Sequence, residues 1–277
     1  MTWLRSSVQI ATLGFCVLTA PDIATAHDEV HLSYEVSLAG LSLATADLDL
    51  IVGDSSYVAR MQYRTSGAAR LTSSGAGEAI AKGAYMGGRF VPATFDLDHR
   101  AGRRSRKIAI TIVDGKIKSM TLDPPIDPDS GRMPFELDKL GTIIDPLSAT
   151  VVSGVTTDGR PETRVCDRIL PIFDGIRRYD IELSLQGSGF SNRGIFIGPL
   201  TNCRLRLMHL SAEEKPENAT QSAERGARLG SVDVTFGFVA AVKVYVPVAI
   251  SAEVGRATLM VRLIQFSTGG ARTDAAR

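Results

Sequence analysis

Two adjacent arginines in a charged segment are the residues of this sequence best suited to bind a ligand. Residues 171–180 read Pro-Ile-Phe-Asp-Gly-Ile-Arg-Arg-Tyr-Asp. An arginine guanidinium is a planar donor that matches the oxygens of a carboxylate or a phosphate. The segment therefore supplies a candidate ligand-binding set, which consists of Asp174, Arg177, Arg178, Tyr179 and Asp180.

Two interpretations of this segment are open. Asp174-Gly175 is a turn signal, and the alternation that begins at Tyr179 predicts a strand. Because neighbouring strand residues point to opposite faces, only one arginine can face a cavity, and the other can pair with Asp180 or Glu182. The simpler interpretation is a hairpin turn with exposed or locally paired arginines. The functional interpretation is an anion-recognising rim beside an apolar cavity.

Catalytic signatures are missing from the sequence. Neither Gly-x-Ser-x-Gly nor His-Glu-x-x-His occurs, and His31, His99 and His209 fall in separate predicted strands. Asp96 and Asp98 would share one strand face, where paired carboxylates can do acid–base or metal chemistry. Alternating polar residues on a solvated strand are the simpler explanation of that pair. We therefore predict no catalytic residue, no metal and no cofactor.

The N-terminus has the parts of a secretory signal peptide. Arg5 supplies a positive charge, Val8–Thr19 is apolar, and Ala24-Thr25-Ala26 is a small-residue cleavage site. The apolar run is too short to span a bilayer. We predict that residues 1–26 are removed after Ala26, that the protein reaches the periplasm, and that the mature chain has no transmembrane segment. A membrane-anchored N-terminus is the alternative.

Export makes the three cysteines informative. Cys16 would leave with the signal peptide, and the bulky Phe15 before it argues against a lipid-modified cysteine. Cys166 and Cys203 then remain in an oxidising compartment, which favours a disulfide over two free thiols. Such a bridge would close a loop of roughly 38 residues and stabilise the fold by ~4 kcal/mol.

The composition indicates one β-rich globular domain. The chain has 277 residues, of which 44% are hydrophobic and 22% charged, and this is enough to bury a core. Its 26 glycines and 12 prolines separate short apolar runs, as in β architectures. The net charge of +1 gives no reason to expect a nucleic-acid partner. We assign residues 27–266 to a single β-rich domain and residues 267–277 to a disordered tail.

Alternation of apolar and polar residues predicts antiparallel strands along this domain. The clearest predicted strands cover 31–40, 44–52, 57–65, 108–113, 116–122, 179–185, 200–210, 232–239, 242–250 and 257–266. Residues 66–89 are small and glycine-rich and predict only weak strands, and Gly187-Ser-Gly predicts a loop. The expected fold is mainly β: a single curved antiparallel sheet or open β-barrel with one short helix packed on it.

The predicted helix lies within Leu137–Ser153, where residues 137–144 are either part of it or a preceding short turn or helix. Asp145 can cap it, Pro146 suits its first position, and Leu147 and Val151 would form its apolar face. A lone helix in a β protein must bury that face. We therefore expect it to lie across the concave side or the open end of the sheet.

Four segments resemble the DUF3108 family of exported bacterial proteins of unknown function. They are Tyr34–Leu41, Asp145–Ser148, Pro171–Asp180 and Tyr245–Ile250, and Phe-Asp-Gly-x-Arg-Arg-Tyr-Asp is the most specific part. The chain departs from the family at Glu253-Val-Gly255, where other members have an aromatic-Gly turn. The resemblance covers most of the mature chain. It implies a curved antiparallel sheet or open barrel, similar in shape to envelope proteins that carry lipids or lipoproteins, and no established catalytic residues.

Three functional hypotheses follow. The first is a non-enzymatic periplasmic protein that binds an apolar or amphipathic ligand, or an envelope protein partner, in a concave sheet. The second is a structural factor for envelope integrity that acts through its surface. The third and least favoured is a hydrolase, which would require His99 or His209 to lie beside a carboxylate and a nucleophile.

Overall fold

The computed structural model describes residues 28–71, 74–86, 89–125, 136–155, 162, 164–211 and 229–269. The predicted signal peptide and residues 270–277 of the predicted tail lie outside this set. Strands dominate the described chain. Its helices are short 3-10 turns, η1 (Gly67–Leu71), η3 (Leu137–Leu140) and η4 (Ser148–Thr150). No helix in the described part of the chain is long and apolar enough to cross a membrane.

One antiparallel sheet contains the strands. The first seven are β1 (Asp28–Leu38), β2 (Leu41–Val52), β3 (Ser56–Thr65), β4 (Gly75–Met86), β5 (Arg89–Ala101), β6 (Arg104–Val113) and β7 (Lys116–Asp123). The others are β8 (Val152–Ser153), β9 (Arg168–Phe173), β10 (Arg178–Ser191), β11 (Gly198–Ser211), β12 (Leu229–Val239), β13 (Val244–Val254) and β14 (Ala257–Gly269). The sheet is curved. It is not closed into a barrel, because its end strands β7 and β9 do not pair with each other. The predicted fold class is confirmed.

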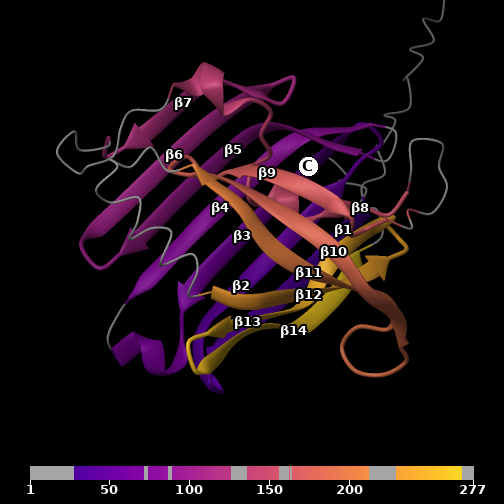
Figure 1. Ribbon diagram of the computed structural model, residues 1–277. Coiled ribbons are helices and arrows are strands. Elements are labelled where there is room, and N and C mark those ends of the chain that lie inside the picture. Colours follow the sequence, from indigo (N-terminus) through magenta and orange to yellow (C-terminus); the bar gives the residue numbers. More distant parts are fainter. Residues whose placement is uncertain are drawn as a thin grey trace, which may run out of the picture.

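The sheet consists of two meanders joined by the first and last strands. The spatial order is β7-β6-β5-β4-β3-β2-β1-β14-β13-β12-β11-β10-β9, so β1 and β14 are neighbours in its interior. Figure 1 shows β9–β12 crossing in front of β1–β6. Strand β14 continues to Gly269, where it lies opposite Glu29. Residues 267–269, predicted to begin the tail, are therefore part of the sheet.

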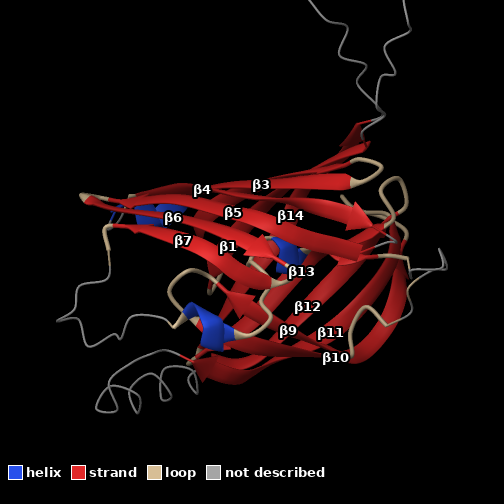
Figure 2. Ribbon diagram, turned by 90° about the horizontal axis from the view of Figure 1, so that it is seen from above, coloured by secondary structure: helices blue, strands red, loops and turns tan. Residues whose placement is uncertain are grey.

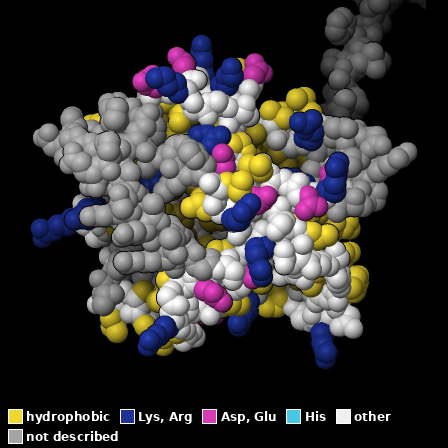
Figure 3. All heavy atoms as spheres, in the orientation of Figure 1, with side chains coloured by type: hydrophobic (Ala, Val, Ile, Leu, Met, Phe, Trp, Pro, Cys, Tyr) yellow, Lys and Arg dark blue, Asp and Glu magenta, His cyan; other side chains and the backbone are white. Residues whose placement is uncertain are grey.

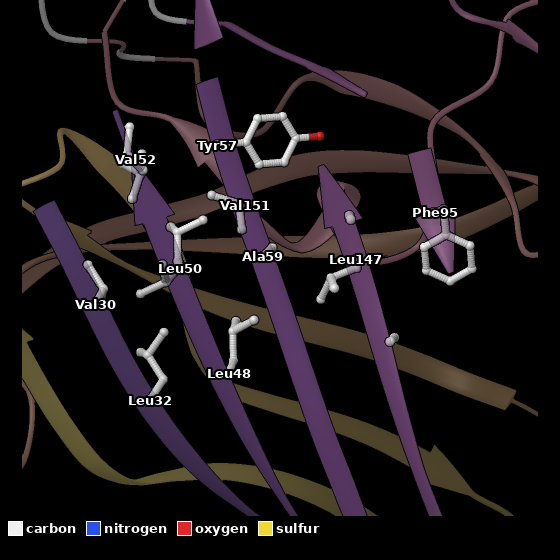
Figure 4. Close-up of a cluster of buried hydrophobic side chains, with 14 of the residues drawn as sticks. Val30, Leu32, Leu48, Leu50, Val52, Tyr57, Ala59, Phe95, Leu147 and Val151 are labelled. Atoms are coloured by element: carbon white, nitrogen blue, oxygen red, sulfur yellow. The ribbon is translucent and has the colours of Figure 1, made fainter. Parts of the chain in front are cut away.

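The apolar face of the first meander forms the main core. Val30 and Leu32 of β1 and Leu48 and Leu50 of β2 are almost fully buried, as their alternation predicts. Figure 4 shows their side chains in one cluster with those of β3 and β5 and with Leu147, which lies outside the strands. The concave side of the sheet is thus filled by side chains and by the segment that carries Leu147.

The predicted helix over 137–153 is wrong in its extent. The segment forms η3 and η4, with extended residues between them. Its predicted position is confirmed, because Leu147 and Val151 are buried in the main core. Asp145 accepts the N–H of Ser148 at its Oδ1 atom (2.8 Å), but the cap residue of η4 is Leu147 and not Asp145 as predicted. We call residues 137–151 the insert.

Hydrogen bonds to the sheet explain why the insert is not a longer helix. The N–H of Ile143 donates to the carbonyl of Gly115 in the β6–β7 turn (2.8 Å), and the N–H of Ile144 donates to Pro171 of β9 (2.8 Å). Phe173 in turn donates to the Ile144 carbonyl (3.0 Å). The insert thus uses its backbone to connect both ends of the open sheet. In Figure 2 the two halves of the sheet diverge, with helical turns between them.

The glycines of β4 allow tyrosines to pack on the strand. Strand β4 covers twelve residues and is longer than its composition predicts. A Cβ atom at Gly77 would collide with the Tyr63 hydroxyl, and one at Gly83 would collide with Tyr57 and the Val91 carbonyl. The glycines therefore provide room for aromatic rings.

The β10–β11 hairpin is also longer than predicted. Gly187-Ser-Gly lies within β10 and pairs with β11, so the loop expected there is displaced to residues 192–197. A register shift between Leu185 and Gly187 marks the irregular position. Phe196 of the loop turns back into the main core, where it packs against Phe266. This contact fixes the loop on β14.

Candidate functional site

The predicted ligand-binding residues surround the β9–β10 turn, where the Asp174 carboxylate holds the backbone. Its Oδ1 atom accepts the N–H groups of Ile176 (2.8 Å) and Arg177 (2.6 Å). Gly175 has a φ of 88°. A Cβ atom there would lie 2.6 Å from the Ile108 side chain of β6. Asp174 therefore shapes a turn that packs closely against the other half of the sheet.

Arg178 and Asp180 form a partly buried ion pair. Nη1 of Arg178 lies 2.6 Å from Oδ1 of Asp180, and Nε of Arg178 donates to the Leu140 carbonyl (2.9 Å). Only 17% of the Arg178 side chain and 24% of the Asp180 side chain are exposed. Glu182 pairs instead with Arg206 of β11 (2.6 Å). Arg178 thus connects the insert to β10, as the local-pairing interpretation predicts for one arginine.

Arg177 and Tyr179 complete the predicted set. Burial raises the pKa of the Tyr179 hydroxyl to about 12, the Asp174 carboxylate acts in the same direction, and Arg177 opposes them. The two side chains are half-buried. Within the described residues, Arg177 has no ion-pair partner. The five residues are therefore neighbours, but Asp174, Arg178 and Asp180 are engaged in structural contacts.

The disulfide predicted between Cys166 and Cys203 is present, with Cα atoms 5.7 Å apart. Both cysteines are buried in a second apolar core, which also contains Leu183 and Val234. The bridge fixes the chain before β9 against β11.

On the face turned to the reader in Figure 1, basic and acidic side chains are interspersed with apolar ones (Figure 3).

A polar cluster lies inside the main core. The hydroxyls of Tyr57 and Ser148 are 2.6 Å apart. The Asp145 side chain is completely buried, and its Oδ2 atom has no hydrogen-bond partner among the described residues. Desolvation raises the pKa of Asp145, although the Ser148 hydroxyl and nearby N–H groups act to lower it. This cluster anchors the insert to β3.

The outer face of β2–β5, opposite the main core, carries an acidic row across the strands. Asp47 lies opposite Gln62, Gln62 opposite Glu78, and Glu78 opposite Asp98. The four side chains point to the same face because directly paired residues share a face. We call these four residues the acidic row.

A basic row follows two residues along each strand. Thr45 lies opposite Arg64, Arg64 opposite Ala76, and Ala76 opposite Arg100. We call these four residues the basic row. Two residues along a strand span about 7 Å, so the two rows are about 7 Å apart. Arg70 of η1 lies beside this row and lines the same hollow.

The two rows border adjoining hollows of about 450 and 680 Å³. The first hollow is lined by the acidic row, and the second by the basic row with Arg70 and by several hydroxyl side chains. Both are lined by Arg64, Ala76 and Arg100, so they form one surface, which we call the outer groove. The small side chain of Ala76 between two arginines accounts for its depth.

The carboxylates of the groove have partners within the protein. Glu78 contacts Arg60 (3.3 Å) and accepts a hydrogen bond from Gln62 (2.9 Å). Asp98 lies 3.5 Å from both Arg100 and Lys107. Partial desolvation acts to raise the pKa of Asp98, but these two cations hold it below its ordinary value.

Two arginines of the groove differ from its carboxylates. Arg64 and Arg70 are exposed, and neither has an ion-pair partner in the part of the chain that the structure describes. The Thr45 hydroxyl, which lines the same hollow, is buried without a hydrogen-bond partner among those residues. The basic end of the groove therefore has unused donors, which is the chemistry of an anion site.

The contact of His99 does not match the predicted requirement for a hydrolase, and the side chain of His209, the other predicted histidine, lies outside the described part of the structure. His31 Nδ1 lies 2.6 Å from Asp49 and its Nε2 lies 3.3 Å from the Ser33 hydroxyl. That hydroxyl donates to Asp47 (2.6 Å). His99 contacts the Tyr63 hydroxyl (2.8 Å). His31, which was not one of the two predicted histidines, thus has a carboxylate and a serine beside it.

The outer groove was not predicted from the sequence. Alternation places Arg64 and Arg100 on strand faces, but their strands are separated by β4, whose register is needed to align them. The local signal that existed was the pair Asp96 and Asp98, of which Asp98 lines the groove. In the described residues, no group of three His, Cys, Asp or Glu side chains could hold a metal ion.

Comparison with known proteins leaves the family of this chain open. No protein-family model and no curated protein matches it. Among solved structures, it is similar to a beta-barrel-like protein of the domain of unknown function DUF1849 from Brucella abortus. The TM-score is 0.49 and the identity 9%, with 89% of this chain and 98% of the other covered.

Proposed function

We propose that the protein is exported to the periplasm and acts there without catalysis, by binding an amphipathic ligand or a partner of the cell envelope in the outer groove. The observation that carries this proposal is that Arg64 and Arg70, beside a hollow of about 680 Å³, have no ion-pair partner among the described residues. Opposite charges that face each other across neighbouring strands stabilise a sheet. Here Glu78 and Asp98 pair with other cations.

The outer groove takes the place of the concave sheet as the proposed site. Leu48, Leu50 and Leu147 are among the side chains that fill the concave side. A ligand there would have to displace the insert, whose backbone is bonded to both ends of the sheet. The groove requires no such displacement.

Export is supported by the pattern of residues 1–26 and by the disulfide, because such bridges persist in oxidising compartments. Cys166 and Cys203 form it in the second apolar core, away from solvent. The relationship to DUF3108 stays a prediction that rests on the four sequence segments.

Mass spectrometry of material that co-purifies from the native envelope tests the proposal. The comparison is between the wild-type chain, the double variant Arg64→Ala/Arg70→Ala, and the control Arg193→Ala, which removes an exposed arginine of the 192–197 loop. We expect one ligand or partner to be retained by the wild type and the control and lost from the double variant. Retention by all three would overturn the groove proposal.

The surface hypothesis makes a different prediction in the same experiment. Phe190 and Ile197, beside and within the 192–197 loop, are 65% and 63% exposed. If Phe190→Ser/Ile197→Ser loses the partner while the arginine variant keeps it, a scaffolding role through this loop replaces the groove.

A hydrolase is the second candidate, because Ser33, His31 and Asp49 lie in the order of a catalytic triad. Against it, Ser33 is only 8% exposed and donates its hydroxyl to Asp47 instead of His31. Labelling with a fluorophosphonate probe, which reacts with an activated serine, tests whether Ser33 is a nucleophile. Labelling of the wild type that disappears in Ser33→Ala would establish a nucleophile, and an unlabelled wild type would end this candidate.

A further inference from the structure

We propose that the outer groove recognises a phosphate group joined through a short spacer to an ammonium group. This inference rests on the proposed function and names the chemical class of its ligand. It starts from the arrangement of charge in the groove, where a basic row and an acidic row run side by side about 7 Å apart.

The basic end of the groove fits a phosphate. Arg64, Arg70 and Arg100 line its hollow, and no carboxylate does so among the described lining residues. Each guanidinium can donate two parallel hydrogen bonds, and a phosphate has more acceptor oxygens than a carboxylate to receive them. The Thr45 hydroxyl is buried there without a partner and supplies a further donor.

The acidic end selects what is attached to the phosphate. Asp47, Glu78 and Asp98 line the adjoining hollow. The Ser33 hydroxyl occupies Oδ1 of Asp47, and carboxylates have acceptor sites beyond a single hydrogen bond. Glu78 and Asp98 are already paired with cations of the protein, whereas Asp47 has no ion-pair partner among the described residues. A second anionic group beside Asp47 would be repelled, and an ammonium group would be attracted. The charge pattern therefore favours a zwitterion over a simple or a doubly anionic phosphate.

Two sources carry this chemistry. A phosphoethanolamine-type group occurs on a lipid headgroup and also as a soluble phosphate ester. The groove lies on the outer face of the sheet, away from the core, so the phosphate can enter with or without an attached apolar chain. The experiment below separates the two sources.

Isothermal titration of the exported, disulfide-bonded protein with three small probes tests the ligand class. The probes are O-phosphoethanolamine, ethyl phosphate, which lacks the ammonium group, and ethanolamine, which lacks the phosphate. We expect O-phosphoethanolamine to bind about tenfold more tightly than ethyl phosphate, and ethanolamine to bind below detection. Equal affinities for O-phosphoethanolamine and ethyl phosphate would overturn the zwitterion.

Matched variants assign each end of the probe. Arg64→Gln/Arg70→Gln is expected to lower affinity for both phosphates by about tenfold or more, whereas Arg193→Gln leaves it unchanged. Asp47→Asn is expected to reduce the preference for O-phosphoethanolamine while ethyl phosphate binds as before or better, because it removes the carboxylate that has no ion-pair partner among the described residues. Unchanged phosphate binding in the double arginine variant would overturn the site.

Vesicles identify the source of the ligand. Co-sedimentation with phosphatidylethanolamine vesicles, lost in Arg64→Gln/Arg70→Gln, supports the proposal with a lipid headgroup as ligand. Binding of soluble O-phosphoethanolamine without vesicle binding supports it with a free ester. If an envelope ligand is retained through Arg64 and Arg70 but neither probe form binds, the proposed function stands and the phosphate–ammonium ligand is overturned.

Discussion

The arginines of the β9–β10 turn and those of the outer groove have opposite environments. Arg178 is mostly buried and bonded to both Leu140 and Asp180. Arg64 and Arg70 are exposed and have no ion-pair partner within the described ranges. The difference teaches that charge density along the sequence is a poor guide to a binding site. Charged residues close together in the sequence can form ion pairs with one another. A ligand-binding hollow instead requires charged side chains that have no ion-pair partner within the protein.

The two regions should therefore respond differently to substitution. The first, which we call the seam, comprises the insert, the β9–β10 turn and the disulfide. The insert is hydrogen-bonded to both ends of the sheet, and the disulfide ties the chain before β9 to β11 within the second meander. The second is the outer groove. Changes in the seam should lower stability and spare binding, and changes in the groove should do the reverse.

The largest expected effect is removal of the disulfide. Cys166 and Cys203 are separated by 37 positions, and opening a loop of this size costs about 4 kcal/mol of stability. Urea unfolding of Cys166→Ala/Cys203→Ala, followed by circular dichroism, measures the loss. Affinity for O-phosphoethanolamine should stay at the wild-type value while the variant is folded. A matching loss of affinity would show that seam and groove are coupled.

Arg178→Ala should have the next largest effect. It removes two hydrogen bonds and leaves the partly buried Asp180 carboxylate without its cation, at a cost of about 2–3 kcal/mol. The same urea titration measures it. Arg178→Lys keeps the charge but cannot reproduce both contacts, so its free energy of unfolding should lie between those of the wild type and Arg178→Ala. A cost below about 0.5 kcal/mol for Arg178→Ala would contradict the structural role, because that is the range of ordinary surface changes.

A smaller effect is expected in the pH dependence of the seam. Burial raises the pKa of Asp145 in the folded protein, so the folded state holds a proton that the unfolded state has lost. Stability should therefore fall as pH rises from the ordinary aspartate range of about 4 to the raised value, and be constant above it. Thermal unfolding of wild type and Asp145→Asn from pH 4 to 8 tests this. The variant should lack that slope, and parallel curves would contradict the assignment.

The smallest stability effect is expected in the groove. Arg64→Gln/Arg70→Gln removes exposed charges without breaking an ion pair seen in the structure, so its free energy of unfolding should change by less than about 0.5 kcal/mol. The same protein should lose phosphate binding. A large loss of stability would show that these arginines stabilise the fold as Arg178 does, and would contradict the difference between the two regions.

Sequence reasoning succeeded where the information is local. Alternation in the strand predicted from residue 31 placed Leu32 and Tyr34 on one face, where both are buried, and the cysteine count identified the disulfide. It failed for the insert, because the sequence signals at Asp145, Leu147 and Val151 are local and favour a helix. The structure is decided instead by hydrogen bonds from Ile143 and Ile144 to the β6–β7 turn and to β9, which are distant in the sequence.

The candidate site shows the same limit more strongly. The composition of residues 66–89 predicted weak structure, but β4 is a full strand whose glycines accept tyrosine rings from β3. Its register aligns Arg64 with Arg100 and Gln62 with Asp98. A shift of one residue would have turned these side chains to the other face, so the groove could not be inferred without the pairing.

The pairing of the first strand with the last has a consequence for how the fold is assembled. Glu29 and Gly269 are partners, so the middle of the sheet is completed by β14, the last strand of the described chain. Until β1 and β14 pair, each of these two strands has one edge without a neighbouring strand. The contact also brings the two ends of the sheet-forming chain together. A circular permutant that joins residues 28 and 269 through a short linker would make this long-range step a local hairpin, and it should fold faster while keeping the same sheet.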